Sequence, residues 1–255
     1  MTNQRKVYFA ADAHLGARFH RDPAGVERLL TAWLSEIRDS AAALYFLGDM
    51  FDYWYEYRYV VPKGYVRFLG KLAELSDAGV EIHLLTGNHD IWMFDYLPAE
   101  INAVIHRDMI TVDLLGKRFL LGHGDEPDYR SRRFRLLRAV FRNRVCQRLY
   151  AGIHPRWTFG FALGWSYDSR RGGLRREHAA SRAEAAVGYL TSFAETYLKT
   201  DPAIDYFIFG HLHILLDRQL SQGSRLLVAG DWMRLFSWIE WDGDTLAIKK
   251  YRGGD

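Results

Sequence analysis

Three observations on this 255-residue chain predict a layered α/β fold. Short apolar runs of strand length recur along the sequence, and in its first third each run is followed by a helical pattern. Each of these runs stops at a cluster of carboxylate, imidazole or amide side chains. In open α/β sheets, ligands bind at the carboxyl ends of the strands. We therefore expect packed sheets and helices with a functional site along one sheet edge.

The first part of the chain contains three consecutive β-then-α units. Apolar runs typical of buried strands cover residues 6–11, 44–47 and 80–85. A first helix is expected from Asp22, the N-cap, through Pro23 at its first position, to about Asp39. A second helix is expected over residues 65–78, and Gly79 would end it.

The second part begins with a hairpin and continues with a long helical tract. The hairpin covers residues 111–121 and turns at Leu115-Gly116. Residues 129–198 have a helical pattern, of which 179–198 is the clearest amphipathic piece. Short strands are expected after this tract, at residues 205–209, 225–229, 236–241 and 245–251. We expect one domain over residues 1–255, in which the tract at about 129–198 is a helical lid insertion between two site-bearing strand ends.

Composition restricts the class of protein. A hydrophobic content of 49% with 25% charged residues is ordinary for a globular protein. The single cysteine, Cys146, excludes an internal disulfide and fits a reducing compartment. We find no signal-peptide segment and no apolar run of transmembrane length, so we expect a cytoplasmic protein whose membrane contact, where it has one, is peripheral. The net charge is only +3, but eight arginines and no acidic residue lie between Arg130 and Arg148, which indicates a local basic patch.

Seven side chains at five expected strand ends form a candidate metal-binding set. They are Asp12, His14, Asp49, Asn88, His123, His211 and His213. Imidazole, carboxylate and amide donors without a thiol suit Mn²⁺, Fe²⁺ or Zn²⁺ rather than a structural thiolate zinc. Seven donors exceed what one ion with open positions needs, and they suit two ions about 3.5–4 Å apart that share a carboxylate and activate a bridging water.

Other polar residues near these positions have weaker interpretations. Asp52 either holds a ligand imidazole from outside or caps the following helix, and Asp125 is a further candidate for the first of these roles. Several histidines match no motif and are interpreted as ordinary histidines: His20, His83, His106, His154 and His178.

The order of these motifs resembles the calcineurin-like metallophosphoesterase superfamily. The motifs are Asp-x-His, Gly-Asp-x-x-Asp, Gly-Asn-His-Asp, Gly-His and Gly-His-x-His, between Asp12 and His213. The resemblance implies an α-β-β-α sandwich and two metal sites bridged by Asp49. One site would be formed by Asp12, His14 and His213, and the other by Asn88, His123 and His211. It also implies that His89 contacts the phosphoryl group or the leaving group, beside Asn88, and that Asp90 orients His89.

Within that superfamily, the chain is most similar to the UDP-2,3-diacylglucosamine pyrophosphohydrolases of lipid A biosynthesis. The shared features are residues 49–54 (DMFDYW), residues 123–125 (HGD) and the helical tract before Gly-His-x-His. The resemblance implies Mn²⁺-dependent water attack at the α-phosphorus of UDP-2,3-diacylglucosamine, which releases UMP and 2,3-diacylglucosamine 1-phosphate (lipid X). The chain departs from the best-known lipid A branch at His89, where an arginine is expected.

The helical tract has features that fit an acylated substrate. Four apolar residues at helical spacing lie among the arginines: Phe134, Leu137, Phe141 and Val145. A basic amphipathic helix of this kind can rest peripherally on the anionic cytoplasmic face of the inner membrane. Five more would offer apolar surface to acyl chains: Trp157, Phe159, Phe161, Leu163 and Trp165. The alternative is that these residues only pack the tract against the body, with solvated arginines.

Two other function classes remain beside the lipid A hydrolase. The same arginines are compatible with a nucleic-acid backbone, so a general phosphodiesterase or nuclease of this fold is the alternative enzyme, although nucleic acid is not the expected partner. A non-catalytic scaffold with this fold should have lost metal ligands, and all seven are present.

Overall fold

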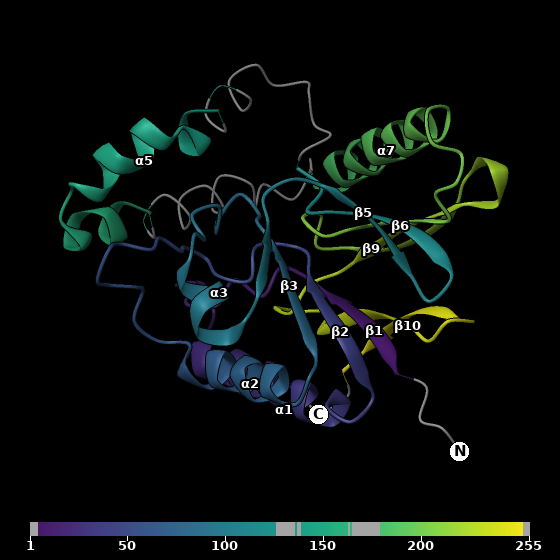
Figure 1. Ribbon diagram of the computed structural model, residues 1–255. Coiled ribbons are helices and arrows are strands. Elements are labelled where there is room, and N and C mark those ends of the chain that lie inside the picture. Colours follow the sequence, from purple (N-terminus) through teal and green to yellow (C-terminus); the bar gives the residue numbers. More distant parts are fainter. Residues whose placement is uncertain (1–4, 126–135, 137–138, 163, 165–178, 252–255) are drawn as a thin grey trace.

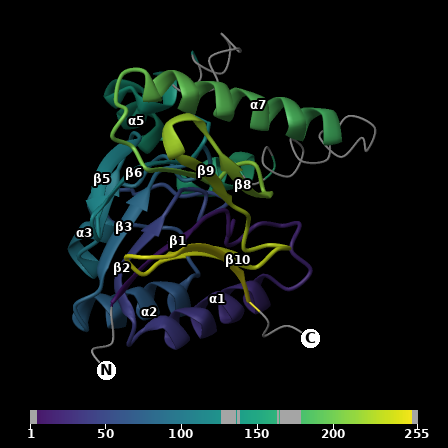
Figure 2. The same ribbon diagram turned by 90° about the vertical axis from the view of Figure 1, so that its right-hand side faces the viewer.

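Two β-sheets pack face to face between outer helices (Figures 1 and 2). The computed structural model describes residues 5–125, 136, 139–162, 164 and 179–251. The first sheet has the strand order β11-β10-β1-β2-β3-β4 and the second has the order β5-β6-β7-β9-β8. The strands of the first sheet are β1 (Lys6–Ala10), β2 (Ala41–Phe46), β3 (Glu81–Leu85), β4 (Val104–His106), β10 (Ser237–Trp241) and β11 (Leu246–Lys250). Those of the second sheet are β5 (Ile110–Leu114), β6 (Lys117–Gly122), β7 (Tyr206–Phe209), β8 (Leu215–Gln219) and β9 (Arg225–Ala229).

The site-bearing strands run parallel within each sheet. β1 to β4 are parallel neighbours in the first sheet, and β6, β7 and β9 are parallel in the second. Antiparallel strands occupy the other positions, with β10 and β11 beside β1, and β5 and β8 at the edges of the second sheet. The carboxyl ends of each parallel set therefore lie together at one edge of its sheet.

Alternation of side chains explains why β1 is apolar on both faces. Val7 and Phe9 point into the core between the sheets, where the Phe9 ring stacks on Phe119 of β6 at a centroid distance of 5.7 Å. Tyr8 and Ala10 point the other way, into the core beneath the helices. In the sequence, a strand that is buried on both faces is a continuous apolar run without alternation. The length of the run, and not its periodicity, therefore indicates a strand here.

Helices cover the outer face of each sheet. α1 (Pro23–Ile37), α2 (Val66–Asp77) and α3 (Tyr96–Ile101) pack on the first sheet, and α7 (Ala179–Leu198) packs on the second (Figure 1). The contact of α7 is made by Leu190, Ala194 and Leu198 against residues of β7 and β9. The expected α-β-β-α layering is confirmed. α5 (Arg144–Ala151) lies above α3 in Figure 1. A short 3₁₀ helix, η2 (Ser221–Gly223), precedes β9.

Most expected elements are present with small shifts of their ends. Asp22 caps α1 as expected, because its side chain accepts a hydrogen bond from the Gly25 N–H at 2.9 Å. The hairpin turns at Leu115 and Gly116, which both have positive φ. β2 begins at Ala41 instead of residue 44, and α3, β4 and β8 were not expected. Within the described residues, no helix combines the length and apolar character needed to cross a bilayer.

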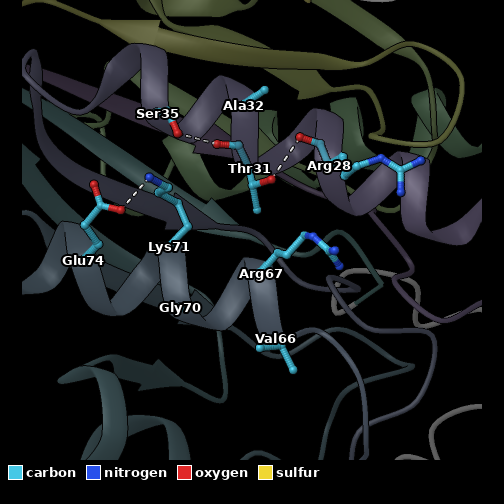
Figure 3. A pocket seen from close by; sticks show the side chains of 9 residues that line it. All are labelled: Arg28, Thr31, Ala32, Ser35, Val66, Arg67, Gly70, Lys71 and Glu74. Carbon is cyan, nitrogen blue, oxygen red and sulfur yellow. Dashed lines mark hydrogen bonds and ion pairs between the residues drawn. The ribbon is translucent and has the colours of Figure 1, made fainter.

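A carboxylate from α1 caps the start of α2. The N-cap of α2, Tyr65, has a left-handed backbone and gives the helix no side-chain hydrogen bond. The buried Glu27 carboxylate instead accepts the N–H groups of Arg67 at 2.9 Å and Phe68 at 3.1 Å. Figure 3 shows the shallow groove that the two helices form on the outer surface, with Arg67 on its lining. Glu27 therefore links the two helices through the otherwise unsatisfied first turn of α2.

We predict that Glu27→Ala lowers the free energy of unfolding by about 1–3 kcal/mol, because the partly buried N–H group of Arg67 and the buried N–H group of Phe68 lose their acceptor. Glu27→Gln keeps an acceptor oxygen and should lose less. The measurement is equilibrium urea unfolding followed by circular dichroism. Glu74→Ala, at an exposed carboxylate of α2, is the control and should change stability by no more than about 0.5 kcal/mol. Equal effects of Glu27→Ala and Glu74→Ala would contradict the capping role.

Candidate metal centre

Strand ends from both sheets deliver the seven expected ligands to one place. Asp12 and His14 follow β1, Asp49 follows β2 and Asn88 follows β3. From the second sheet, His123 follows β6, and His211 and His213 follow β7. Five of the seven have positive φ values between 41° and 66°: Asp12, His14, Asp49, His211 and His213. Residues other than glycine seldom adopt this conformation, and its concentration here is typical of a functional site.

The first group of ligand atoms centres on Asp12. Its Oδ1 atom lies 3.7 Å from His14 Nε2 and 3.6 Å from His213 Nε2. The rings of His14 and His213 stack with their centroids 5.4 Å apart. One nitrogen from each histidine and one Asp12 oxygen are close enough together to hold a metal ion.

The second group centres on His123. Its Nε2 atom lies 3.3 Å from Asn88 Oδ1, 3.2 Å from His211 Nδ1 and 3.3 Å from Asp49 Oδ2. Asp49 Oδ2 is also 3.6 Å from His14 Nε2, which belongs to the first group. Asp49 therefore lies between the two groups, where its carboxylate could be shared by two metal ions.

These residues fit a pair of divalent cations. Asp12 and His14 are fully buried, and among the described residues the Asp12 Oδ1 atom has no hydrogen-bond partner. A buried carboxylate oxygen without a hydrogen bond is costly unless a cation satisfies it. The donors are nitrogen and oxygen atoms only, which suits Mn²⁺, Fe²⁺ or Zn²⁺. When bound, such a pair supplies Lewis acidity and an activated water for attack on phosphorus.

The polar groups of the centre shift one another's pKa values. Burial opposes ionisation of Asp49, but His123, His89 and His14 around it hold its pKa well below the usual range. Burial opposes the charged form of His123 too, and the neighbouring Asp49 carboxylate nevertheless raises the pKa of that imidazole. Burial, with the positive charge of His123, lowers the pKa of His211 to about 4. His211 is therefore held neutral, which is the form that ligates metals.

Asp90 and His89 lie at the centre in different roles. The buried Asp90 carboxylate accepts backbone N–H groups from the two ligand loops, at 2.8 Å from both Met50 and Gly87 and at 3.2 Å from Asp49. Burial and the charge of Asp49 raise the pKa of Asp90 to about 7. The His89 ring instead contacts Asp52, with Nδ1 3.0 Å from its carbonyl oxygen and 3.6 Å from its Oδ1. These contacts make Asp90 the link between two loops, and Asp52 is the residue that holds His89.

The two candidates for an outer role are both buried next to ligand histidines. Asp52 Oδ1 lies 3.4 Å from His14 Nδ1, which favours the outer-ligand interpretation over a helix cap. Asp125 is buried, and its charge acts on both His123 and His211.

Asp231 was not expected at the centre. Its Oδ2 atom lies 3.7 Å from Nδ1 of His213. It follows β9 as Gly230-Asp231, the same order that Gly48-Asp49 has after β2, so the signal was present in the sequence.

An aromatic cluster attaches the α5 segment to the loops of the metal centre. It contains Tyr53, Tyr55, Ile91 and Trp92 from the body, packed against residues that include Phe141, Tyr150 and Phe159. The Tyr53 and Tyr150 hydroxyls are 3.0 Å apart, Tyr55 donates to the carbonyl of Gln147, and Trp92 donates to the carbonyl of Phe141. The polypeptide at 141–162 is therefore anchored beside the candidate centre.

The apolar residues expected in the helical tract divide into two kinds. Phe141 and Phe159 pack against the body, as in the alternative interpretation. Val145, Trp157 and Phe161 are exposed. Phe134, Leu137, Leu163 and Trp165, and the arginines between residues 130 and 138, lie outside the described residues.

Comparisons with known proteins identify the family of this chain. A family model described as Calcineurin-like phosphoesterase matches residues 5–215. The UDP-2,3-diacylglucosamine hydrolase of Porphyromonas gingivalis is 51% identical over 254 residues, which cover 96% of this chain and 97% of that protein. The protein of the same name from Ralstonia nicotianae is 30% identical, over 89% of this chain and 83% of that protein.

Among solved structures, a novel archaeal phosphodiesterase aligns with 96% of this chain and 98% of its own, at 12% identity and a TM-score of 0.46. The resemblance inferred from the motifs is confirmed by the family match, which includes all seven expected ligands. The chain belongs to the calcineurin-like phosphoesterase family.

Proposed function

We propose that this protein hydrolyses the pyrophosphate of UDP-2,3-diacylglucosamine, releasing UMP and 2,3-diacylglucosamine 1-phosphate in lipid A biosynthesis. The observation that carries the proposal is the 51% identity, over nearly the full length of both chains, to a relative named for this substrate. The convergence of seven nitrogen and oxygen ligands supports the hydrolytic chemistry.

The metal ligands divide into two sets in this proposal. Asp12, His14 and His213 would hold one ion, Asn88, His123 and His211 would hold the other, and Asp49 would bridge them. We propose Mn²⁺ as the physiological metal, within the range that this donor set accepts.

His89 is the group that we assign to the substrate phosphate. Its side chain is 21% exposed, whereas His14 and His123 are fully buried. Asp52 contacts its Nδ1 atom and so orients the ring, and we assign the Nε2 atom to the phosphoryl oxygen or the leaving group. Asn88, next to it in the loop, contributes its amide to the same region.

The helical tract serves as the cover for the acyl chains. We propose that residues 129–198 form an insertion in a single domain spanning residues 1–255. The aromatic cluster supports this, because it anchors residues 141–162 to the loops that follow Asp52 and Asp90.

An exposed apolar row on the same tract supports peripheral contact with the cytoplasmic face of the inner membrane. The row consists of five exposed residues spaced by four: Val145, Leu149, Ile153, Trp157 and Phe161. Exposed Arg144, Arg148 and Arg156 lie among them, and residues 139–162 contain no acidic side chain. Apolar insertion combined with arginine contacts to anionic lipid is the usual basis of such binding.

The function is tested by substrate comparison with the purified protein and Mn²⁺. We expect UMP release from UDP-2,3-diacylglucosamine and a rate lower by about 10²-fold or more with UDP-glucose, because the binding energy of the acyl chains is lost. Asp49→Asn should be inactive on every substrate, since it weakens the bridge. Equal rates on the two UDP-sugars would refute the substrate assignment. Faster hydrolysis of bis-p-nitrophenyl phosphate or single-stranded DNA would favour the general phosphodiesterase or nuclease.

The role of His89 is tested by His89→Ala. We expect turnover to fall by about 10²–10⁴-fold, the usual effect of removing an acid or base group, while two ions remain bound. Turnover is followed by UMP release and metal content by inductively coupled plasma mass spectrometry. A parallel loss of bound metal would make His89 a ligand and contradict the assignment.

Membrane contact is tested by cosedimentation with vesicles containing phosphatidylglycerol. The double variant Leu149→Ser/Trp157→Ser should bind vesicles about tenfold or more weakly, since two apolar side chains no longer enter the interface. Val66→Ser, at an equally exposed apolar residue of α2 (Figure 3), should bind like the wild type. Unchanged binding of the double variant would exclude this row as the contact surface.

A further inference from the structure

Asp231 is placed by the turn that follows β9. The side chain is buried, and its Oδ1 atom accepts the backbone N–H groups of Met233 at 2.9 Å, Arg234 at 2.7 Å and Leu235 at 3.0 Å. Three hydrogen bonds to one oxygen fix the orientation of the carboxylate. The other oxygen, Oδ2, faces His213 Nδ1 at 3.7 Å.

The turn itself is held against the Asp12 loop. Gly230 has a φ of +83°, and a Cβ there would lie 2.1 Å from Ser237 Oγ, so only glycine fits. The Trp232 N–H donates to the carbonyl of Asp12 at 3.2 Å. The Trp232 ring is fully buried and packs against the ring of Trp33 in α1, with the two centroids 4.9 Å apart. Asp231 is therefore mounted on a rigid element that is also tied to the metal ligand Asp12.

His213 is partly exposed and, within the part of the chain that the structure describes, lacks a close contact that would fix the orientation of its ring. Its side chain is 31% exposed, and its Nδ1 atom is buried without a hydrogen-bond partner among the described residues. By comparison, Nδ1 of His123 contacts the Leu47 carbonyl at 2.8 Å and Nδ1 of His14 lies 3.4 Å from Asp52. The 3.7 Å between His213 and Asp231 exceeds a hydrogen bond, but Asp231 Oδ2 is the acceptor to which a small ring rotation would bring Nδ1.

We propose that Asp231 is a positioning residue that holds His213 as the tautomer with its proton on Nδ1. This tautomer leaves the Nε2 lone pair directed toward Asp12, where the metal of the first group would bind. Ligating histidines commonly give their second N–H to a carboxylate, and loss of that carboxylate typically weakens metal binding by about 10–100-fold. The inference rests on the metal-binding part of the proposed function and is independent of the substrate.

Substitution by asparagine distinguishes this role from a structural one. Asp231→Asn keeps an oxygen for the three N–H groups of the turn, but it presents an NH₂ group to His213 Nδ1. The histidine must then accept at Nδ1 and carry its proton on Nε2, which blocks ligation. Asp231→Ser caps the turn less well but leaves His213 free to adopt either tautomer.

The experiment is a Mn²⁺ titration of EDTA-treated protein, with binding followed by electron paramagnetic resonance and isothermal calorimetry. We expect one of the two binding steps to weaken about 10–100-fold in Asp231→Asn and less in Asp231→Ser, while the other step stays near wild type. Apo-protein melting temperatures should follow the opposite order, with Asp231→Ser the less stable. In the His213→Ala background, Asp231→Asn should have no further effect on metal binding.

Asp242→Asn is the matched control. The Asp242 carboxylate accepts the N–H groups of Asp244 and Thr245 in a similar turn at the surface. The Asp242→Asn variant should bind both ions like the wild type. The proposal is overturned if Asp231→Asn also binds both ions normally, or if Asp231→Ser binds metal more weakly than Asp231→Asn. Because no substrate is used, inactivity toward UDP-2,3-diacylglucosamine would leave this result unaffected.

Discussion

The structure of the centre depends on one shared carboxylate oxygen. Asp49 Oδ2 lies 3.6 Å from His14 Nε2, which follows β1 of the first sheet, and 3.3 Å from His123 Nε2, which follows β6 of the second. The two sheets must therefore meet at their strand ends as well as through their apolar faces. The fit around Asp49 is tight, because a Cβ on Gly87 would lie 2.1 Å from its Oδ1. Glycine at that position is what lets the β3 loop approach the carboxylate.

Asp90 shows how such a polar centre is stabilised inside an apolar fold. Its carboxylate satisfies N–H groups of residues 49–51 and of Gly87, so one buried side chain organises the loops after both β2 and β3. Buried polar groups stabilise a structure only when they are satisfied. The four hydrogen bonds to Asp90 compensate for its burial, and they offset the strain of the left-handed backbone at Asp49.

The sequence predicted the layers and which polar residues would lie together at the strand ends, because both are signalled locally. A strand of β-type residues followed by Gly-Asp or Gly-His is visible without a structure, and it identified Asp49 and His123. The partners of the ligands are signalled less well. Whether Asp52 or Asp90 holds His89 depends on loop paths that only the fold determines. Asp231 was missed because no other motif residue follows β9, although its Gly-Asp order was informative.

The helical tract illustrates a different limit of sequence reasoning. Periodicity predicted a helix over residues 179–198 but gave no information on which surface it would cover. The helix α7 packs on the second sheet through Leu190 and Ala194, so it belongs to the outer layer of the sandwich. The α5 segment instead packs on the aromatic cluster near the metal centre. Two pieces of one continuous helical pattern thus have different partners.

This attachment connects the proposed cover to the chemistry. Tyr53 and Trp92, which anchor the α5 segment, are adjacent in sequence or nearly so to Asp52 and Asp90. Asp52 holds His89 and His14, and Asp90 holds the loops of Asp49 and Gly87. A displacement of the α5 segment therefore acts on the same short loops that orient the ligands. In the proposed function, this attachment links the fit of the cover to the geometry of the metal centre, through Asp52-Tyr53 at one anchor and Asp90 to Trp92 at the other.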